Sequence, residues 1–176
     1  MKVIGIDPGS RIAGYGVVEK GRTGLLNLCH GVIELDPQTP LSVRLFEISS
    51  AISLLIAEHM PDAVSVETVF YSKNVKSAVI LGHVRGACLL AAAAANIRVF
   101  EYAPTKIKQA VTGYGRADKA QVQRMVKLLL KLSEEPEPDA ADALASAICH
   151  IQHSNLLSAA GYRSSVKNRY PFTGNR

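Results

Sequence analysis

The order of its apolar segments is the feature that most constrains how this chain can fold. Three segments with β-strand character come first, before any helical pattern, at residues 3–6, 12–19 and 25–35. Strand and helix patterns then follow in the order helix 41–60, strand 63–67, helix 74–95, strand 99–102 and helices 104–111, 118–132 and 139–153. Strands connected through helices run parallel, whereas consecutive strands with short turns form an antiparallel meander. The chain is therefore predicted to be an α/β protein, with a mixed five-stranded sheet and helices on both faces.

Length and composition are those of an ordinary soluble protein. The 176 residues suit one domain, predicted to span residues 1–157 and to be followed by a basic, flexible tail at 158–176. No uninterrupted apolar stretch reaches the roughly 20 residues of a membrane span, and the N-terminus lacks the layout of a signal peptide. Cys29, Cys88 and Cys149 lie far apart without a metal-binding spacing. These features predict a reduced, cytoplasmic location.

The basic residues are concentrated in two places. The chain carries a net charge of +5, and residues 98–131 hold eight Lys and Arg against two acids. Residues 151–176 hold four Lys and Arg and no acid. This distribution suits a polyanionic partner such as nucleic acid, although a role in solubility explains a basic isoelectric point equally well.

Four acidic residues are predicted to meet at one edge of the sheet. Asp7 and Glu67 each end an apolar strand, and neighbouring strands lie about 4.8 Å apart. Asp139 and Asp142 are three apart on one face of the last helix, among alanines that permit close packing on the sheet. Converging carboxylates repel one another unless cations bind them, and their oxygens suit Mg²⁺ or Mn²⁺. Taken singly, Asp7 could instead shape the Pro-Gly turn that follows it, and Asp139 could interact with the helix dipole.

Four short sequence blocks stand out along the chain. They are IGIDPG at 4–9, VETVF at 66–70, a lysine-rich segment through Lys108 and Lys119, and DAADALA at 139–145. In this order they resemble the RuvC family of Holliday junction resolvases, over nearly the whole predicted domain. The resemblance implies a ribonuclease-H-like fold. It also implies that the catalytic, metal-binding acids are Asp7, Glu67, Asp139 and Asp142.

The resemblance further implies a homodimeric endonuclease that resolves four-way DNA junctions in recombination and repair. Two Mg²⁺ ions per active site, for which Mn²⁺ should substitute, would support a hydrolysis that leaves 5′-phosphate and 3′-hydroxyl ends. Cooperation with the branch-migration complex RuvAB is implied as well. The family places lysines that match Lys108 and Lys119 near the scissile phosphate, and an aromatic residue that matches Phe70 against unpaired bases.

Further residues are assigned to DNA contact by their type and position. Phe70 could stack on bases, or it could fold back on the core. Contacts with DNA are also predicted for Tyr71, Lys73, Lys76, Lys106, Arg116 and Arg124. Gly82 and Gly86, four apart in a helix, allow close packing, either inside the domain or against a second copy. His150 and His153 lie near Cys149, but no fourth ligand has a spacing that suits zinc.

Three other functions deserve comparison with a junction nuclease. An actin-like ATPase also begins with an Asp-x-Gly hairpin, but it needs two lobes, which 176 residues cannot supply. A nuclease of the same fold that acts on RNA–DNA hybrids differs in its contacts to 2′-hydroxyl groups, which the sequence does not show. A non-catalytic DNA-binding module fits poorly with four acids, because acids weaken DNA binding.

Overall fold

The structure is a computed structural model that describes residues 1–68 and 75–159, with side chains as far as residue 154. Its elements are β1 (Lys2–Asp7), β2 (Ile12–Lys20), β3 (Leu25–Glu34), α1 (Leu41–His59), β4 (Ala63–Glu67), α2 (Val75–Ala94), β5 (Arg98–Tyr102), α3 (Pro104–Thr112), α4 (Lys119–Leu130) and α5 (Pro138–Ala159). The order of strands and helices is the predicted one.

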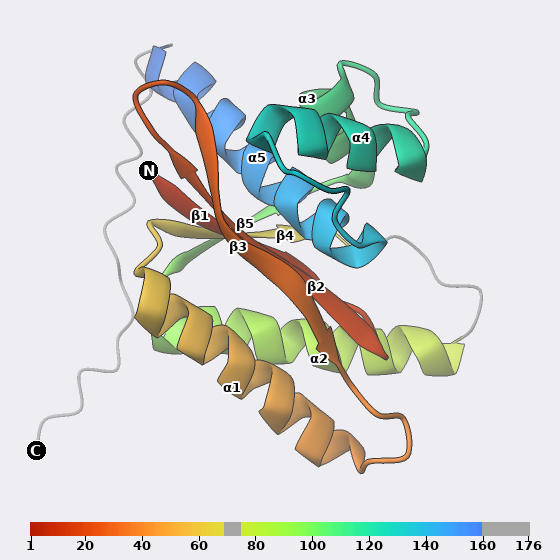
Figure 1. Cartoon of the computed structure of the whole chain (residues 1–176). Coiled ribbons are helices and arrows are strands. Elements are labelled where there is room, and N and C mark those ends of the chain that lie inside the picture. Colours follow the sequence, from red (N-terminus) through yellow and green to blue (C-terminus); the bar gives the residue numbers. More distant parts are fainter. Residues whose placement is uncertain (69–74, 160–176) are drawn as a thin grey trace, which may run out of the picture.

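The strands form one mixed sheet in the order β3-β2-β1-β4-β5. β1 pairs antiparallel with β2 and parallel with β4, and β5 lies parallel to β4. Helices α3, α4 and α5 cover one face of the sheet, and α1 and α2 cover the other (Figure 1). The predicted α/β architecture is therefore confirmed. Parallel pairing aligns Ile6 with Val66, so β1 and β4 end at the same edge.

Helix α5 lies very close to the two strands nearest its start. The backbone of Asp139 occupies the place where a side chain on Gly14 of β2 would lie, and the backbone of Ala143 does the same at Gly5 of β1. The helix meets the sheet with fully buried small residues, namely Ala140, Ala141, Ala143, Ala145 and Ala147. Helix backbone cannot move aside as the end of a side chain can. The two glycines therefore set how closely α5 approaches β1 and β2.

The rest of α5 is held by polar contacts with the other strands. The hydroxyl groups of Ser65 on β4 and Ser146 lie 2.7 Å apart in the core, and Ser65 also donates to the Ser146 carbonyl. At β5, the Tyr102 hydroxyl lies 2.7 Å from His150 Nδ1. Burial, followed by the charge of nearby His153, lowers the pKa of His150 to about 4. His150 is thus a neutral ring of the core edge at pH 7, and its ring nitrogen is engaged by Tyr102.

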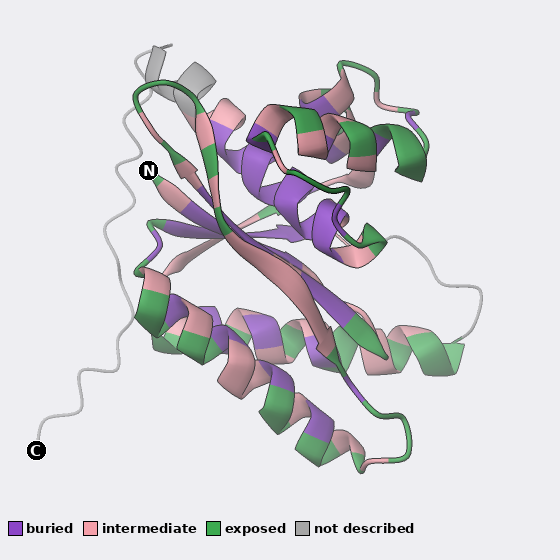
Figure 2. Ribbon diagram, viewed as in Figure 1, coloured by how far each residue is buried: buried purple, intermediate pink, exposed green. Residues whose placement is uncertain are grey.

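The other face of the sheet is covered by α1 and α2. α1 buries Ile48, Ile52 and Ile56 at the spacing that its amphipathic pattern predicts. By length and composition alone α2 could cross a membrane, with a mean hydropathy of 1.6 in its most apolar stretch. The search for an uninterrupted apolar stretch in the sequence did not identify this helix, because Lys76 and Arg85 interrupt it. In the structure α2 packs along α1 on one face of the sheet, with both buried and exposed positions along its length (Figure 2). Cys88 is fully buried.

Two helix ends differ from the predicted bounds by two residues or more. α5 continues to Ala159 rather than ending at residue 153, because the sequence has no glycine or proline before Gly161. α4 ends at Leu130, where Lys131 adopts a left-handed conformation with φ of 53° and its N–H donates back to the Leu128 carbonyl. Neither difference changes the layers of the fold.

We expect Gly14→Ala to destabilise the protein and to displace the start of α5. The new methyl group would meet the Asp139 backbone, and overpacking of this kind costs about 1–3 kcal/mol. Gly21→Ala is the matched control, because its methyl group would have as nearest neighbour the Leu26 side chain at 3.3 Å, which is 50% exposed and can move. Urea unfolding measures both variants. Equal stability of Gly14→Ala and the wild type would contradict this role for the glycine.

Candidate active site

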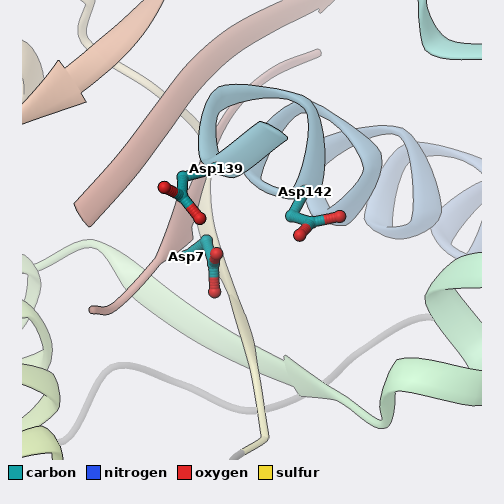
Figure 3. Close-up of side chains that lie close together, drawn as sticks. All are labelled: Asp7, Asp139 and Asp142. Carbon is teal, nitrogen blue, oxygen red and sulfur yellow. The ribbon is translucent and has the colours of Figure 1, made fainter. Parts of the chain in front are cut away.

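Three carboxylate side chains converge at the edge of the sheet where β1 ends. Asp7 is the last residue of β1, and Asp139 and Asp142 lie near the start of α5. A carboxylate oxygen of each lies within 4.8 Å of those of the other two, and the three side chains gather where β1 ends and α5 begins (Figure 3). The structure thus brings together three of the four acids that were predicted to share this edge. We call Asp7, Asp139 and Asp142 the three-acid group.

Glu67, the fourth acid, lies beside the three-acid group without joining it. It ends β4, the parallel neighbour of β1, but its carboxylate is not part of the set within 4.8 Å. Burial and then the charge of Asp142 raise the pKa of Glu67, while Lys108 and Lys119 lower it. Glu67 is therefore coupled to the group electrostatically. The four acids form an edge of negative charge that is wider than the three-acid group alone.

Among the four acids, Asp7 shows the largest effect of this repulsion on its pKa. Its pKa is raised to about 7, first by burial and then by the charges of Asp142, Glu67 and Asp139, while Lys119 opposes the shift. A divalent cation would relieve both the repulsion and the lost hydration. Every donor in the three-acid group is a carboxylate oxygen, which is the ligand type that Mg²⁺ and Mn²⁺ prefer. The residues present therefore fit a hard divalent cation.

Helix α4 begins next to the three-acid group and presents Lys119 to it. Asp118 caps this helix by accepting a hydrogen bond from the Gln121 backbone N–H at 2.8 Å, and the Gln121 side chain accepts from the Asp118 N–H at 3.0 Å. This capping box makes Lys119 the first residue of α4. The Lys119 ammonium lies 3.1 Å from Asp142 Oδ2. A lysine predicted to lie near the acids is thus in direct contact with one of them.

The other predicted contact residues are distributed over the surface around this edge. Lys108 lies on α3, close enough to Glu67 to lower its pKa. Three other predicted contact residues are exposed. Lys76 lies in the first turn of α2, Arg116 lies just before α4, and Arg124 lies on α4. Phe70, Tyr71 and Lys73 lie outside the described residues.

Lys106 has partners inside the protein that local sequence patterns did not reveal. Its Nζ lies 2.9 Å from His153 Nε2 and 5.3 Å from the centre of the Tyr102 ring. His153 follows Asp142 by 11 residues on α5, which is about 16 Å along the helix axis. The Lys106 ammonium therefore lies away from the three-acid group, where it ties α3 to α5. Only the contact of three separate elements creates this arrangement.

Together, the fold and the acidic edge define a class of protein. A five-stranded mixed sheet with acids at the ends of β1 and β4 and on the helix that crosses them is the arrangement of ribonuclease-H-like, metal-dependent nucleases. A family model described as crossover junction endodeoxyribonuclease RuvC matches residues 3–150. The chain therefore belongs to the RuvC family, which confirms the resemblance carried by the four sequence blocks.

Relatives match nearly the whole chain. It is 50% identical over 169 residues to the crossover junction endodeoxyribonuclease RuvC of Trichlorobacter lovleyi, covering 96% of this chain and 95% of that one. The RuvC of Caldanaerobacter subterraneus is 45% identical over 163 residues, covering 92% and 99%. Among solved structures, T. thermophilus RuvC in complex with a Holliday junction substrate has a TM-score of 0.82 and 33% identity, covering 89% and 96%. The yeast mitochondrial resolvase Ydc2, at 13% identity and a TM-score of 0.65, shares the fold.

Without divalent metal, we expect Asp7 to contribute a loss of stability as the pH rises from about 4 to 7, while His150, whose pKa is lowered to about 4, contributes a gain below about pH 6.5. The folded protein keeps the Asp7 proton up to a pKa of about 7, whereas the unfolded chain releases it near 3.8. At Asp7 the folded state binds more protons in this window, so each pH unit of increase costs up to about 1.4 kcal/mol at this site. Asp7→Asn cannot ionise at this position, so its stability should rise relative to the wild type across this window and exceed it above pH 7.

Melting temperatures in EDTA across this pH range test the expectation. Glu134→Gln, which removes an exposed carboxylate from the loop before α5, is the control and should keep the wild-type slope. Added Mg²⁺ should stabilise the wild type more than Asp7→Asn at pH 7. An identical pH slope in wild type and Asp7→Asn would show that the repulsion at Asp7 is not significant.

Proposed function

We propose that this chain is a crossover junction endodeoxyribonuclease, which cuts four-way DNA junctions by paired nicks. The observation that carries the proposal is the three-acid group at the end of β1, with Glu67 beside it, in a chain of the RuvC family. The likeness to T. thermophilus RuvC in complex with a Holliday junction substrate supports the choice of substrate. The activity would serve recombination and repair in the cytoplasm, together with RuvAB.

The proposed cofactor is Mg²⁺, two ions per site, with Mn²⁺ able to replace it. Asp7, Asp139 and Asp142 would hold the ions together with Glu67. When bound, two such ions activate a water molecule and stabilise the leaving 3′ oxygen in an in-line displacement at phosphorus. The arrangement of the four acids supports two ions rather than one. The three-acid group could bind one ion by itself, and Glu67 lies outside that group, where it could contribute to a second.

Lysines of α3 and α4 are proposed to counter the charge that develops on the scissile phosphate. Lys119 pairs with Asp142, yet its side chain is 65% exposed, so the ammonium can turn to a phosphate once cations neutralise the acid. Lys108 occupies the corresponding place beside Glu67. Preorganised charge of this kind favours the transition state over the ground state. Neither lysine needs to take up or release a proton for this role.

DNA on either side of the cleavage point is proposed to contact exposed residues around the acidic edge. Arg116 lies just before α4 and Arg124 lies on it. Both are on the part of the chain that carries Lys119, where phosphates could pass. Lys76 in the first turn of α2, and Phe70, Tyr71 and Lys73 just before it, would extend this surface past Glu67. We propose that Phe70 stacks on an unpaired base there.

A homodimer is proposed to form through α2. Val75, Val79, Gly82, Gly86 and Leu90 fall within about 80° of one face of this helix. The three large side chains are exposed, and a side chain at either glycine would find no protein atom within 4 Å. Among residues 1–68 and 75–154, the glycines therefore do not serve packing within the protomer. An apolar face with small residues at its centre suits a second copy of the same helix, related by a two-fold axis that matches the near two-fold symmetry of a junction.

The proposal is tested with a synthetic four-way junction, a linear duplex and an RNA–DNA hybrid, each with and without Mg²⁺. We expect paired nicks in the junction only when Mg²⁺ is present. Preferential cutting of the hybrid would indicate a ribonuclease H activity instead. Junction binding without any cutting would indicate a non-catalytic module.

Asp7→Asn should reduce junction cleavage by more than about 100-fold, because it removes a ligand shared by the ions. Junction binding in the absence of metal should persist or become tighter, since one negative charge beside the phosphates is lost. Gel shifts in EDTA and cleavage in Mg²⁺ separate the two effects, with Glu134→Gln as the control. Near-normal nicking by Asp7→Asn would rule out the proposed metal site.

Leu90→Glu should convert the dimer to a folded monomer, because it places a charge within an apolar contact. Leu128→Glu is the matched control, since Leu128 on α4 is also 66% exposed but lies outside the α2 face. Light scattering after size exclusion gives the mass of each variant, and the junction assay counts nicks per junction. A Leu90→Glu variant that remains dimeric would exclude this interface.

A further inference from the structure

Arg44 is a buried cation on the side of α1 that packs against the sheet. It is the first of four buried residues on this helix face, and the other three are Ile48, Ile52 and Ile56. Arg44 is only 8% exposed, so it occupies a position where the pattern of the helix calls for an aliphatic residue. An arginine cannot lose its charge by deprotonation in a protein, so its burial carries the cost of desolvating a cation.

The surroundings of Arg44 offset only part of that cost. Within the described residues, no carboxylate forms an ion pair with it, and its buried Nε has no hydrogen-bond partner. Arg44 also lies in the first turn of α1, where the helix dipole disfavours a cation, and no acidic residue lies in that turn. Local rules that are broken in this way point to a role other than stability.

A hydrogen bond of the Arg44 side chain reaches the turn that follows Asp7. Nη1 donates to the Ser10 carbonyl at 3.2 Å. Ser10 is three residues beyond Asp7, in the tight turn between β1 and β2. Gly9 in the same turn has no room for a side chain, because the Ile12 carbonyl lies against it. The turn is thus reached by α1 from one face of the sheet, while α5 contacts β1 from the other (Figure 1).

We infer that Arg44 is a positioning residue for the metal centre, because its guanidinium holds the turn that follows Asp7 and thereby fixes the direction of the Asp7 carboxylate. The inference rests on the proposed metal-dependent function of the acidic edge. Helix α5 places Asp139 and Asp142, but Asp7 belongs to β1 and its turn. A contact behind a ligand typically changes metal affinity or activity by about 10- to 100-fold.

Arg44→Met separates positioning from stability. Methionine suits the aliphatic face of α1 and removes the unpaired charge, so the melting temperature in EDTA should equal or exceed that of the wild type. A Mg²⁺ titration of the melting temperature without DNA should show the metal midpoint raised by about tenfold. Single-turnover junction cleavage at saturating Mg²⁺ should also slow by about tenfold. Arg44→Lys keeps a donor for Ser10 and should recover part of both losses.

Arg85→Met is the matched control. Arg85 also buries an Nε without a partner, but its guanidinium lies 2.6 Å from Glu101 on β5. Its loss should lower the melting temperature and leave the Mg²⁺ midpoint unchanged. An unchanged midpoint in Arg44→Met would overturn the inference, as would a drop in its melting temperature in EDTA. If the wild type fails to cut junctions, the proposed function falls instead, and the Mg²⁺ midpoints still decide the role of Arg44.

Discussion

The close approach of α5 to β1 and β2 is the contact on which the rest of the site depends. Gly5 and Gly14 let helix backbone lie where side chains would otherwise stand. Only at that distance can Asp139 and Asp142, on a helix, come within 4.8 Å of Asp7, on a strand. A larger residue at either glycine would move two of the three acids away from the third. Packing in the core and the geometry of the acids are thus one constraint.

The convergence of these acids causes electrostatic repulsion that the rest of the protein neutralises only in part. Burial and three neighbouring carboxylates act together on Asp7, and a single lysine contact, from Lys119 to Asp142, opposes them. Elsewhere the capping box of Asp118 uses an acid to start α4, and that start is what brings Lys119 to the group. The remaining repulsion is the free energy that a divalent cation can release on binding. Incomplete neutralisation is therefore consistent with a site that gains its stability from the metal.

Local patterns were sufficient for the fold because strand period, helix period and turn residues left few topologies. Asp7 and Glu67 could be placed at one edge since helix-linked strands run parallel. Contacts between distant elements could not be predicted in this way. The contacts of Lys106 with His153 and Tyr102 join residues of α3, α5 and β5. Because a local sequence pattern does not show such contacts, Lys106 could not be distinguished from other surface lysines. The contact of Arg44 could not be predicted either. A helical pattern shows which face of a helix is buried, but it does not show which backbone carbonyl a residue on that face will contact.

The two faces of the sheet carry different parts of the proposed activity. On one face, α5 and α4 build the acidic edge and supply Lys119. On the other, α1 supports the turn after Asp7, and α2 carries the proposed dimer contact. Residues 68–74 link the end of β4, at Glu67, to the start of α2, so a proposed metal ligand and the proposed dimer helix are joined by seven residues. A two-fold contact through α2 would therefore fix the separation of the two acidic edges, and that separation would select substrates whose two cleavable strands lie equally far apart.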